Sequence, residues 1–147
     1  MKNIKAKMQF LDNYVKEYEM KVNGKIDMNT LLKLNCSLGF GIIKIEENEK
    51  NKIGQIQIAY DVKILKEKEE KEIGKIHLVM EALFEGDKEL SNEQFEKMLK
   101  YNGAPTLSQI ARAYIISNTS LNGMPVINIP MINFAEFFEN SNKKNKI

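Results

Sequence analysis

Several residue types are nearly absent from this 147-residue chain, and each absence removes a class of site. Tryptophan does not occur, and Cys36 and His77 are the only cysteine and the only histidine. A single cysteine cannot form a disulfide within the chain, and one Cys with one His cannot complete a zinc site of Cys and His ligands. No run of about 18 apolar residues occurs, so a membrane-spanning helix of ordinary length is excluded.

Neither sign of charge is in excess. The chain has 22 Lys and Arg residues against 20 Asp and Glu residues, a net charge of +2, and Arg112 is the only arginine. Lysine offers a point charge and lacks the two-pronged guanidinium that grips phosphates and guanine edges. Composition therefore argues against nucleic acid as a partner, and a lysine-mediated binder would show affinity that falls steeply with salt.

Signatures of catalysis are missing as well. The sequence has no Gly-rich phosphate loop, nucleophile elbow or metal-binding motif. We expect His77 to be a surface residue without a partner, and Cys36, which lies in an alternating apolar row, to act as a small buried hydrophobe. The lysines near the N-terminus are not followed by a signal-peptide core, so we expect a cytoplasmic protein. These observations predict no enzyme, no catalytic residue, no metal and no cofactor.

The chain does contain four segments in which apolar and polar residues alternate. They cover about 8–22, 32–45, 56–64 and 73–85, and a period of two predicts half-buried strands. The first has Tyr14 and Tyr18 on one phase, and the phase of the second slips after Ile42, which predicts a bulge near Gly41. Short polar links between successive segments favour an antiparallel meander.

The pattern then changes to helical spacing. Ser91 and Gln94 form a capping box that opens a short helix, which we expect residues 102–105 to break. A longer helix follows from about Thr106 and stops near Gly123. Strands first and helices afterwards predict an α+β domain: a four-stranded antiparallel sheet (meander) with C-terminal helices packed on one face and a polar opposite face. We expect one domain over residues 1–139 and a flexible, lysine-rich tail over 140–147.

The most distinctive segment is the connector, residues 122–133, between the long helix and the last one. Pro125 and Pro130 hold it extended, and Asn133 can cap the last helix with Glu136 at the third helical position. A stiff apolar connector of this kind favours one wall of a groove or an interface. The alternative is that its Ile, Val and Met side chains fill the core of the domain itself.

The order of these elements resembles SecB, the protein-export chaperone. The matching positions are the Ala-Arg pair that ends in Arg112 in the long helix, Gly123 and Pro125 at its end, and residues 130–134, Pro-Met-Ile-Asn-Phe. The resemblance implies an ATP-independent holdase: a homotetramer, built as a dimer of dimers, that holds unfolded polypeptides in hydrophobic grooves. Methionine suits such a groove because its side chain is flexible and polarizable.

The resemblance and the apolar pattern together assign candidate site residues. The client-binding groove is predicted from Phe40, Met124, Val126, Ile127, Ile129, Met131, Phe137 and Phe138. The oligomer interface is predicted from Arg112, Tyr114 and Ile116, with a structural role for the arginine. The groove assignment predicts that Ile127→Asp with Ile129→Asp abolishes client binding and leaves the fold intact.

The chain departs from SecB in its charge. SecB proteins are acidic and dock the motor ATPase SecA on their sheet face and tail, whereas this chain is slightly basic and has lysines in its tail. SecA docking, and with it an export role, is thus open to question. The alternative is a dedicated SecB-like interaction protein, such as a toxin–antitoxin-associated chaperone, with one partner in place of general clients.

Overall fold

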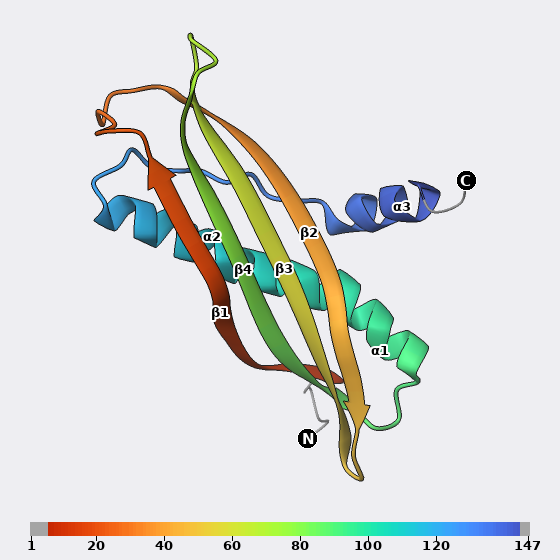
Figure 1. Cartoon of the computed structure of the whole chain (residues 1–147). Coiled ribbons are helices and arrows are strands. Elements are labelled where there is room, and N and C mark those ends of the chain that lie inside the picture. Colours follow the sequence, from red (N-terminus) through yellow and green to blue (C-terminus); the bar gives the residue numbers. More distant parts are fainter. Residues whose placement is uncertain (1–5, 145–147) are drawn as a thin grey trace.

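The computed structural model describes residues 6–144, with side chains described to residue 140. It contains one sheet with all helices on one face (Figure 1). The strands are β1 (Met8–Val22), β2 (Leu32–Glu47), β3 (Asn51–Lys66) and β4 (Glu72–Asp87). The helices are α1 (Asn92–Met98), the π-helical turn η1 (Leu99–Gly103), α2 (Ala104–Leu121) and α3 (Phe134–Lys144). Helix α3 thus extends into the predicted tail, and residues 145–147 of that tail lie outside the described residues.

The predicted α+β class is confirmed, because the four strands form one antiparallel sheet with the C-terminal helices on one face. The strand order is β1-β4-β3-β2. Strands β2, β3 and β4 follow one another as a meander, and β1 pairs with β4 at the far edge. The first and second strands are therefore the two edges of the sheet.

Bulges interrupt both edge strands. The predicted bulge in β2 is present, as a register shift between Ile42 and Lys44. Strand β1 shifts register twice, and the second shift lies between Val15 and Glu17. The prediction that Tyr14 and Tyr18 share a phase is wrong, because a bulge inserts one residue and moves all later side chains to the opposite face.

Elements α1, η1 and α2 follow one another without a gap and form one continuous helical rod, so the predicted break at 102–105 is also wrong. The capping box of Ser91 and Gln94 opens the rod as expected. In η1 the Ala104 N–H donates to the Leu99 carbonyl five residues back. Pro105 then enters where the α-helical ladder is already interrupted, so its missing N–H does not end the helix.

Two glycines let the rod approach the end of the sheet. A Cβ atom on Gly86 would lie 2.6 Å from Phe95 Cε1, and one on Gly54 would lie 2.7 Å from Leu99 Cδ1. Both Phe95 and Leu99 are completely buried. The glycines are required here because any larger residue would occupy the space of these core side chains.

Helix α2 covers the middle of the sheet. Leu107, Ala111 and Ile115 face it and are completely buried against β3 and β4. The buried Tyr60 hydroxyl of β3 is paired with Ser108 Oγ at 2.5 Å, which satisfies both groups inside the core. At the C-terminus, the Met124 and Gly123 N–H groups donate back to the carbonyls of Thr119 and Ser120, with Gly123 at φ 70°. This is the hydrogen-bond pattern of a Schellman motif, and it ends the helix where the sequence predicted.

The opposite, outer face of the sheet is mostly polar, as expected. His77 is not without partners, however: its Nδ1 lies 2.7 Å from Asp61 and its Nε2 3.0 Å from Glu17. Glu81, almost fully covered, accepts from the Tyr14 hydroxyl at 2.5 Å and from Gln55 Nε2 at 2.8 Å. The Tyr14 hydrogen bond, opposed by desolvation, lowers the pKa of Glu81. These contacts could not be predicted from the sequence, because they depend on the pairing register of neighbouring strands.

Candidate functional site

The inner face of the sheet is incompletely covered along β2. The side chains of β3 and β4 under α2 have at most 2% of their surface exposed, as in Ile58 and Leu78. Along β2 the same alternation of apolar residues continues, but every inner side chain is only half-buried. We call this row the β2 margin; it consists of Leu34, Cys36, Leu38 and Phe40. The margin is an apolar strip at the side of a closed core.

Five aromatic rings continue the β2 margin toward α3. The ring centroid of Phe138 lies 5.1 Å from Phe40 of β2 and 5.5 Å from Tyr101 of η1, both in edge-to-face geometry. Phe134 and Phe137 complete the cluster on α3 itself. Edge-to-face pairs at these distances stabilise by about 0.5–1.5 kcal/mol each beyond the area they bury. We refer to the five residues as the aromatic cluster.

Helix α3 begins as the sequence predicted. Asn133 Oδ1 accepts from the Glu136 N–H at 3.2 Å, which satisfies one of the free donors of the first turn. The helix lies beside β2 and projects past this edge of the sheet (Figure 1). Its packing against η1 and β2 goes through the aromatic cluster.

The connector alternates between core and solvent with a period of two. Ile127 and Ile129 have no exposed surface, whereas Val126 is 70% and Met131 72% exposed. Arg112 Nε donates to the carbonyl of Ile129 at 2.9 Å, which ties the connector to α2. The connector therefore behaves as an extended segment with one side in the core and one side outward.

This alternation corrects half of the predicted groove. Met124, Ile127, Ile129 and Phe138 are core residues of the chain and cannot contact a client in this conformation. The burial of Ile127 and Ile129 also argues against the expectation that Ile127→Asp with Ile129→Asp leaves the fold intact. The remaining candidates reach the surface: Val126 and Met131 are exposed, and Phe40 and Phe137 are half-buried.

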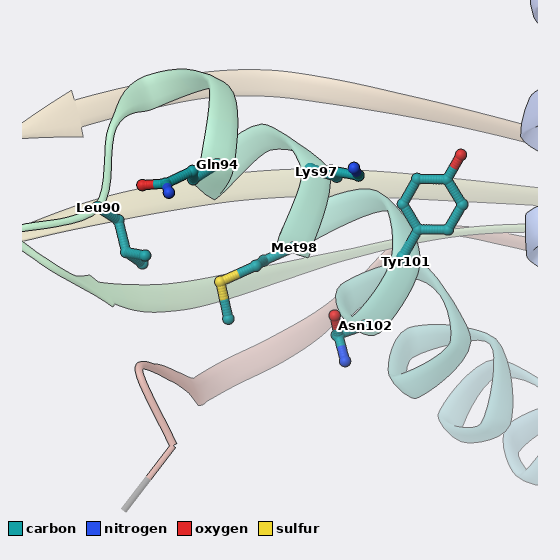
Figure 2. Close-up of a pocket in the computed structure, with 6 residues that line it drawn as sticks. All are labelled: Leu90, Gln94, Lys97, Met98, Tyr101 and Asn102. Atoms are coloured by element: carbon teal, nitrogen blue, oxygen red, sulfur yellow. The ribbon is translucent and has the colours of Figure 1, made fainter.

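An open hollow lies along α1 and η1 (Figure 2). Its volume is about 380 Å³, and its lining is Leu90, Gln94, Lys97, Met98, Tyr101 and Asn102. Figure 2 shows Leu90 and Met98 on one side of the helix and the Tyr101 ring projecting on the other. Tyr101 belongs both to this hollow and to the aromatic cluster, so apolar surface continues from one to the other.

The two free edges of the sheet differ. Strand β1 is bulged twice and carries charged residues along its length, including Lys16, Glu17 and Glu19. From Leu32 to Ile42, β2 runs regularly and has one charge, on Lys33. Bulges and charges are what keep an edge strand from pairing with other chains. The β1 edge is thus protected, and the β2 edge beside the margin is open.

The predicted interface residues lie on the flanks of α2. Tyr114 packs edge-to-face on Tyr18 of β1, with ring centroids 5.2 Å apart. Arg112 also donates through Nη1 to Gln109, 3.0 Å away, and Ile116 is half-buried. Their contacts within the chain explain these positions without a second copy, so an interface role stays a prediction.

Neither chemistry nor metal binding is indicated by the site. Within residues 6–144 no three His, Cys, Asp or Glu side chains gather as metal ligands would, and no helix is long and apolar enough to span a membrane. Desolvation raises the pKa of the Cys36 thiol, which disfavours the reactive thiolate. What the arrangement offers is apolar surface beside an open strand edge.

The predicted groove left out five residues of the margin and the aromatic cluster: Leu34, Cys36, Leu38, Tyr101 and Phe134. The two leucines were assigned to a buried strand face because alternation alone does not tell how much of that face the helices cover. Tyr101 had no signal, because the π-helical turn that places it was predicted to be a break.

Comparison with known proteins supports the fold. No protein-family model matches the chain, and no curated protein matches its sequence. Among solved structures, this chain is similar to the SecB-like chaperone Rv1957 of Mycobacterium tuberculosis, with 14% identity and a TM-score of 0.64. The similarity covers 86% of this chain and 91% of that one. The Rv1957 structure is a complex with a ChAD peptide from the Rv1956 HigA1 antitoxin. A Streptococcus agalactiae protein of unknown function is 16% identical over 84% of this chain and 96% of that one, with a TM-score of 0.43. The chain therefore has a SecB-like fold.

Proposed function

We propose that the protein is an ATP-independent chaperone that holds unfolded polypeptide segments. The observation that carries the proposal is the β2 margin: a row of apolar side chains that the protein's own helices leave half-covered. It is flanked by the aromatic cluster and by the outward side of the connector. A client would cover this surface with apolar side chains in extended conformation.

The free energy gained by covering these apolar side chains is sufficient for useful binding of a client. Covering one large apolar side chain fully contributes about 1.5–3 kcal/mol before the cost of ordering the client. Half-buried residues such as Leu38 and Phe40 contribute less, while Val126 and Met131, about 70% exposed, can contribute most of that amount. Several such contacts reach micromolar affinity, about 8 kcal/mol, only when they act together. We therefore expect long clients to bind and short peptides to bind weakly.

The geometry also favours a mode of binding. The open β2 edge presents unpaired backbone groups directly beside the margin. An extended client can add to this edge as a fifth strand, with backbone hydrogen bonds independent of sequence and alternate side chains on the margin. Such recognition tolerates many client sequences.

A connector variant separates binding from folding. Val126→Asp with Met131→Asp places two charges at exposed positions, so the fold should persist while client affinity falls at least about tenfold, because covering a charge is costly. Asn128→Asp is the matched control, since Asn128 is exposed on the same segment and is already polar. Affinity is measured by calorimetric titration with a slow-folding, unfolded polypeptide. Equal affinity for the wild type and the double variant would remove the connector from the site.

A second candidate function is that of a dedicated chaperone for one partner. The similar Rv1957 structure contains a peptide from an antitoxin, which makes this candidate specific. The two functions differ in breadth: a general holdase binds several unrelated unfolded clients, and these compete with one another. Strong binding to a single partner segment, with no binding to unrelated clients, would favour the dedicated chaperone.

Assembly into a homotetramer belongs to the proposal as well. Two exposed features support association of copies: the outward side of α2 has one charged residue, Arg112, and Leu121 at its end is 86% exposed. Light scattering of the purified chain tests the assembly, and a monomer at micromolar concentration would contradict it.

SecA as a partner has no support in these features and stays a prediction to be tested by direct titration.

A further inference from the structure

One row of the sheet breaks the rule that opposite charges face each other across strands. On the outer face, Lys21 of β1 lies directly opposite Lys75 of β4, and Lys75 lies directly opposite Lys63 of β3. Asn35 of β2 completes the row. We call the three lysines the lysine row. Neighbouring strands are about 4.8 Å apart, so the row places three positive charges across about 10 Å.

No other directly opposed pair in the sheet carries charges of the same sign. The neighbouring row shows the usual arrangement, with His77 between Glu19 and Asp61. Like charges directly opposite one another destabilise a sheet. A local rule that is broken without a gain in stability is typical of a functional position.

The nearby acids neutralise the row only in part. His77 holds Asp61 and Glu17 through its two ring nitrogens. Glu19 pairs with Lys21 at 3.1 Å and also attracts Lys75 at longer range. Within the described part of the chain, Lys63 and Lys75 form no ion pair, and both are exposed. Lys63 and Lys75 therefore keep exposed ammonium groups that can contact an anion.

We propose that the lysine row docks an acidic polypeptide segment. Separated carboxylates on a peptide can contact Lys63 and Lys75 while avoiding Glu19 and Asp61, which would repel a continuous phosphate backbone. The row also has no arginine to grip phosphates in two-pronged fashion. The outer face is opposite the β2 margin, so an acidic partner and a client can bind at the same time. The proposal is independent of the proposed chaperone function.

The test uses an acidic peptide without apolar residues. A labelled peptide of alternating Glu and Ser, about 12 residues long and so able to cross the sheet, is titrated against the full chain at about 50 mM salt. The same peptide with Gln in place of Glu is the uncharged reference. We expect the Glu peptide to bind and the Gln peptide not to, with affinity falling as salt is raised to about 500 mM.

Two double variants locate the binding. Lys63→Gln with Lys75→Gln should weaken the Glu peptide about tenfold or more, whereas Lys44→Gln with Lys50→Gln, the same charge change at exposed lysines elsewhere, should change affinity less than about twofold. The row variant should unfold at no lower temperature than the wild type, because it removes a repulsion. Its affinity for unfolded clients should not change, which separates this proposal from the chaperone function.

Three results would overturn the proposal. One is no binding of the Glu peptide even at low salt. A second is an equal loss of affinity in both double variants, which would indicate a general charge effect. The third is tighter binding of an oligothymidine probe with loss of that binding in the row variant, which would make the occupant a nucleic acid.

Discussion

The middle and the margin of the inner sheet face are built from the same kinds of residue, yet they differ in exposure. Ile58 of β3 and Leu78 of β4 are fully buried, while Leu38 and Phe40 of β2 are only partly buried. A helix is about 10–12 Å wide with its side chains, and strands are about 4.8 Å apart. One rod can therefore seal two strands of a four-stranded sheet. The difference shows that coverage by the helices, and not the pattern of the strands, separates core from candidate binding surface.

The largest effect should come from charging the core side of the connector. Ile127→Asp with Ile129→Asp buries two carboxylates at positions with no exposed surface. Each costs several kcal/mol, which together approaches a total stability of about 5–15 kcal/mol. We expect loss of cooperative thermal unfolding and of the native circular dichroism spectrum. Asn128→Asp, between the two and exposed, should fold normally.

A folded double variant with an unchanged unfolding midpoint would contradict the assignment of Ile127 and Ile129 to the core. It would mean that the connector leaves the core readily and that its inward isoleucines are available to clients after all.

A smaller effect should come from adding one methyl group in a closely packed part of the inner sheet face and one on β2. Gly86→Ala places a Cβ 2.6 Å from the buried Phe95 ring, and overpacking of this kind costs about 1–3 kcal/mol. Gly41→Ala, on β2, meets nothing within 4 Å and should be neutral or slightly stabilising. Urea denaturation of the two variants measures the contrast. Equal destabilisation by the two variants would show that β2 at Gly41 is packed as closely as the end of the sheet at Gly86.

The alkylation rate of the Cys36 thiol measures how exposed the β2 margin is to solvent. Desolvation raises its pKa, so less thiolate is present at neutral pH. We expect alkylation by iodoacetamide to be slower than for free cysteine, yet complete in the folded protein. Bound client should slow it further. A rate equal to that of free cysteine would show that the margin is fully exposed, and no reaction at all would show that it is core.

The smallest effect should be a pH dependence of stability that comes from His77 on the outer face of the sheet. Hydrogen bonds to Asp61 and then to Glu17 raise the pKa of His77 above its ordinary 6.5. Protonation thus favours the folded state: this contribution is fully present below about pH 6.5 and is lost as pH rises through the higher pKa of the folded protein. We expect the wild type to exceed His77→Gln in thermal midpoint at about pH 5.5 and to lose that advantage by about pH 9. The effect should be small because the histidine is partly exposed. An advantage that grows with pH would contradict the assigned contacts.

Much of the fold could be predicted from local patterns. Alternation located all four strands, and the caps at Ser91, Gly123 and Asn133 marked helix ends, because each depends on neighbours in sequence. The site could be predicted only in part. Val126 and Met131 are outward as expected, but Ile127 and Ile129 are not, since a periodicity of two shows that alternate residues differ and leaves open which set faces the core.

The sequence by itself determined the α+β class, the strand segments, the capped helices and an extended connector, since these follow from local propensity and proline chemistry. Only the tertiary structure decided three features: the pairing of β1 with β4, the continuity of the rod through Pro105, and the exposure of the β2 margin. Each depends on residues far apart in the chain or on the cooperative geometry of a turn. The candidate binding surface and the lysine row belong to this second group, because both are created by register and coverage.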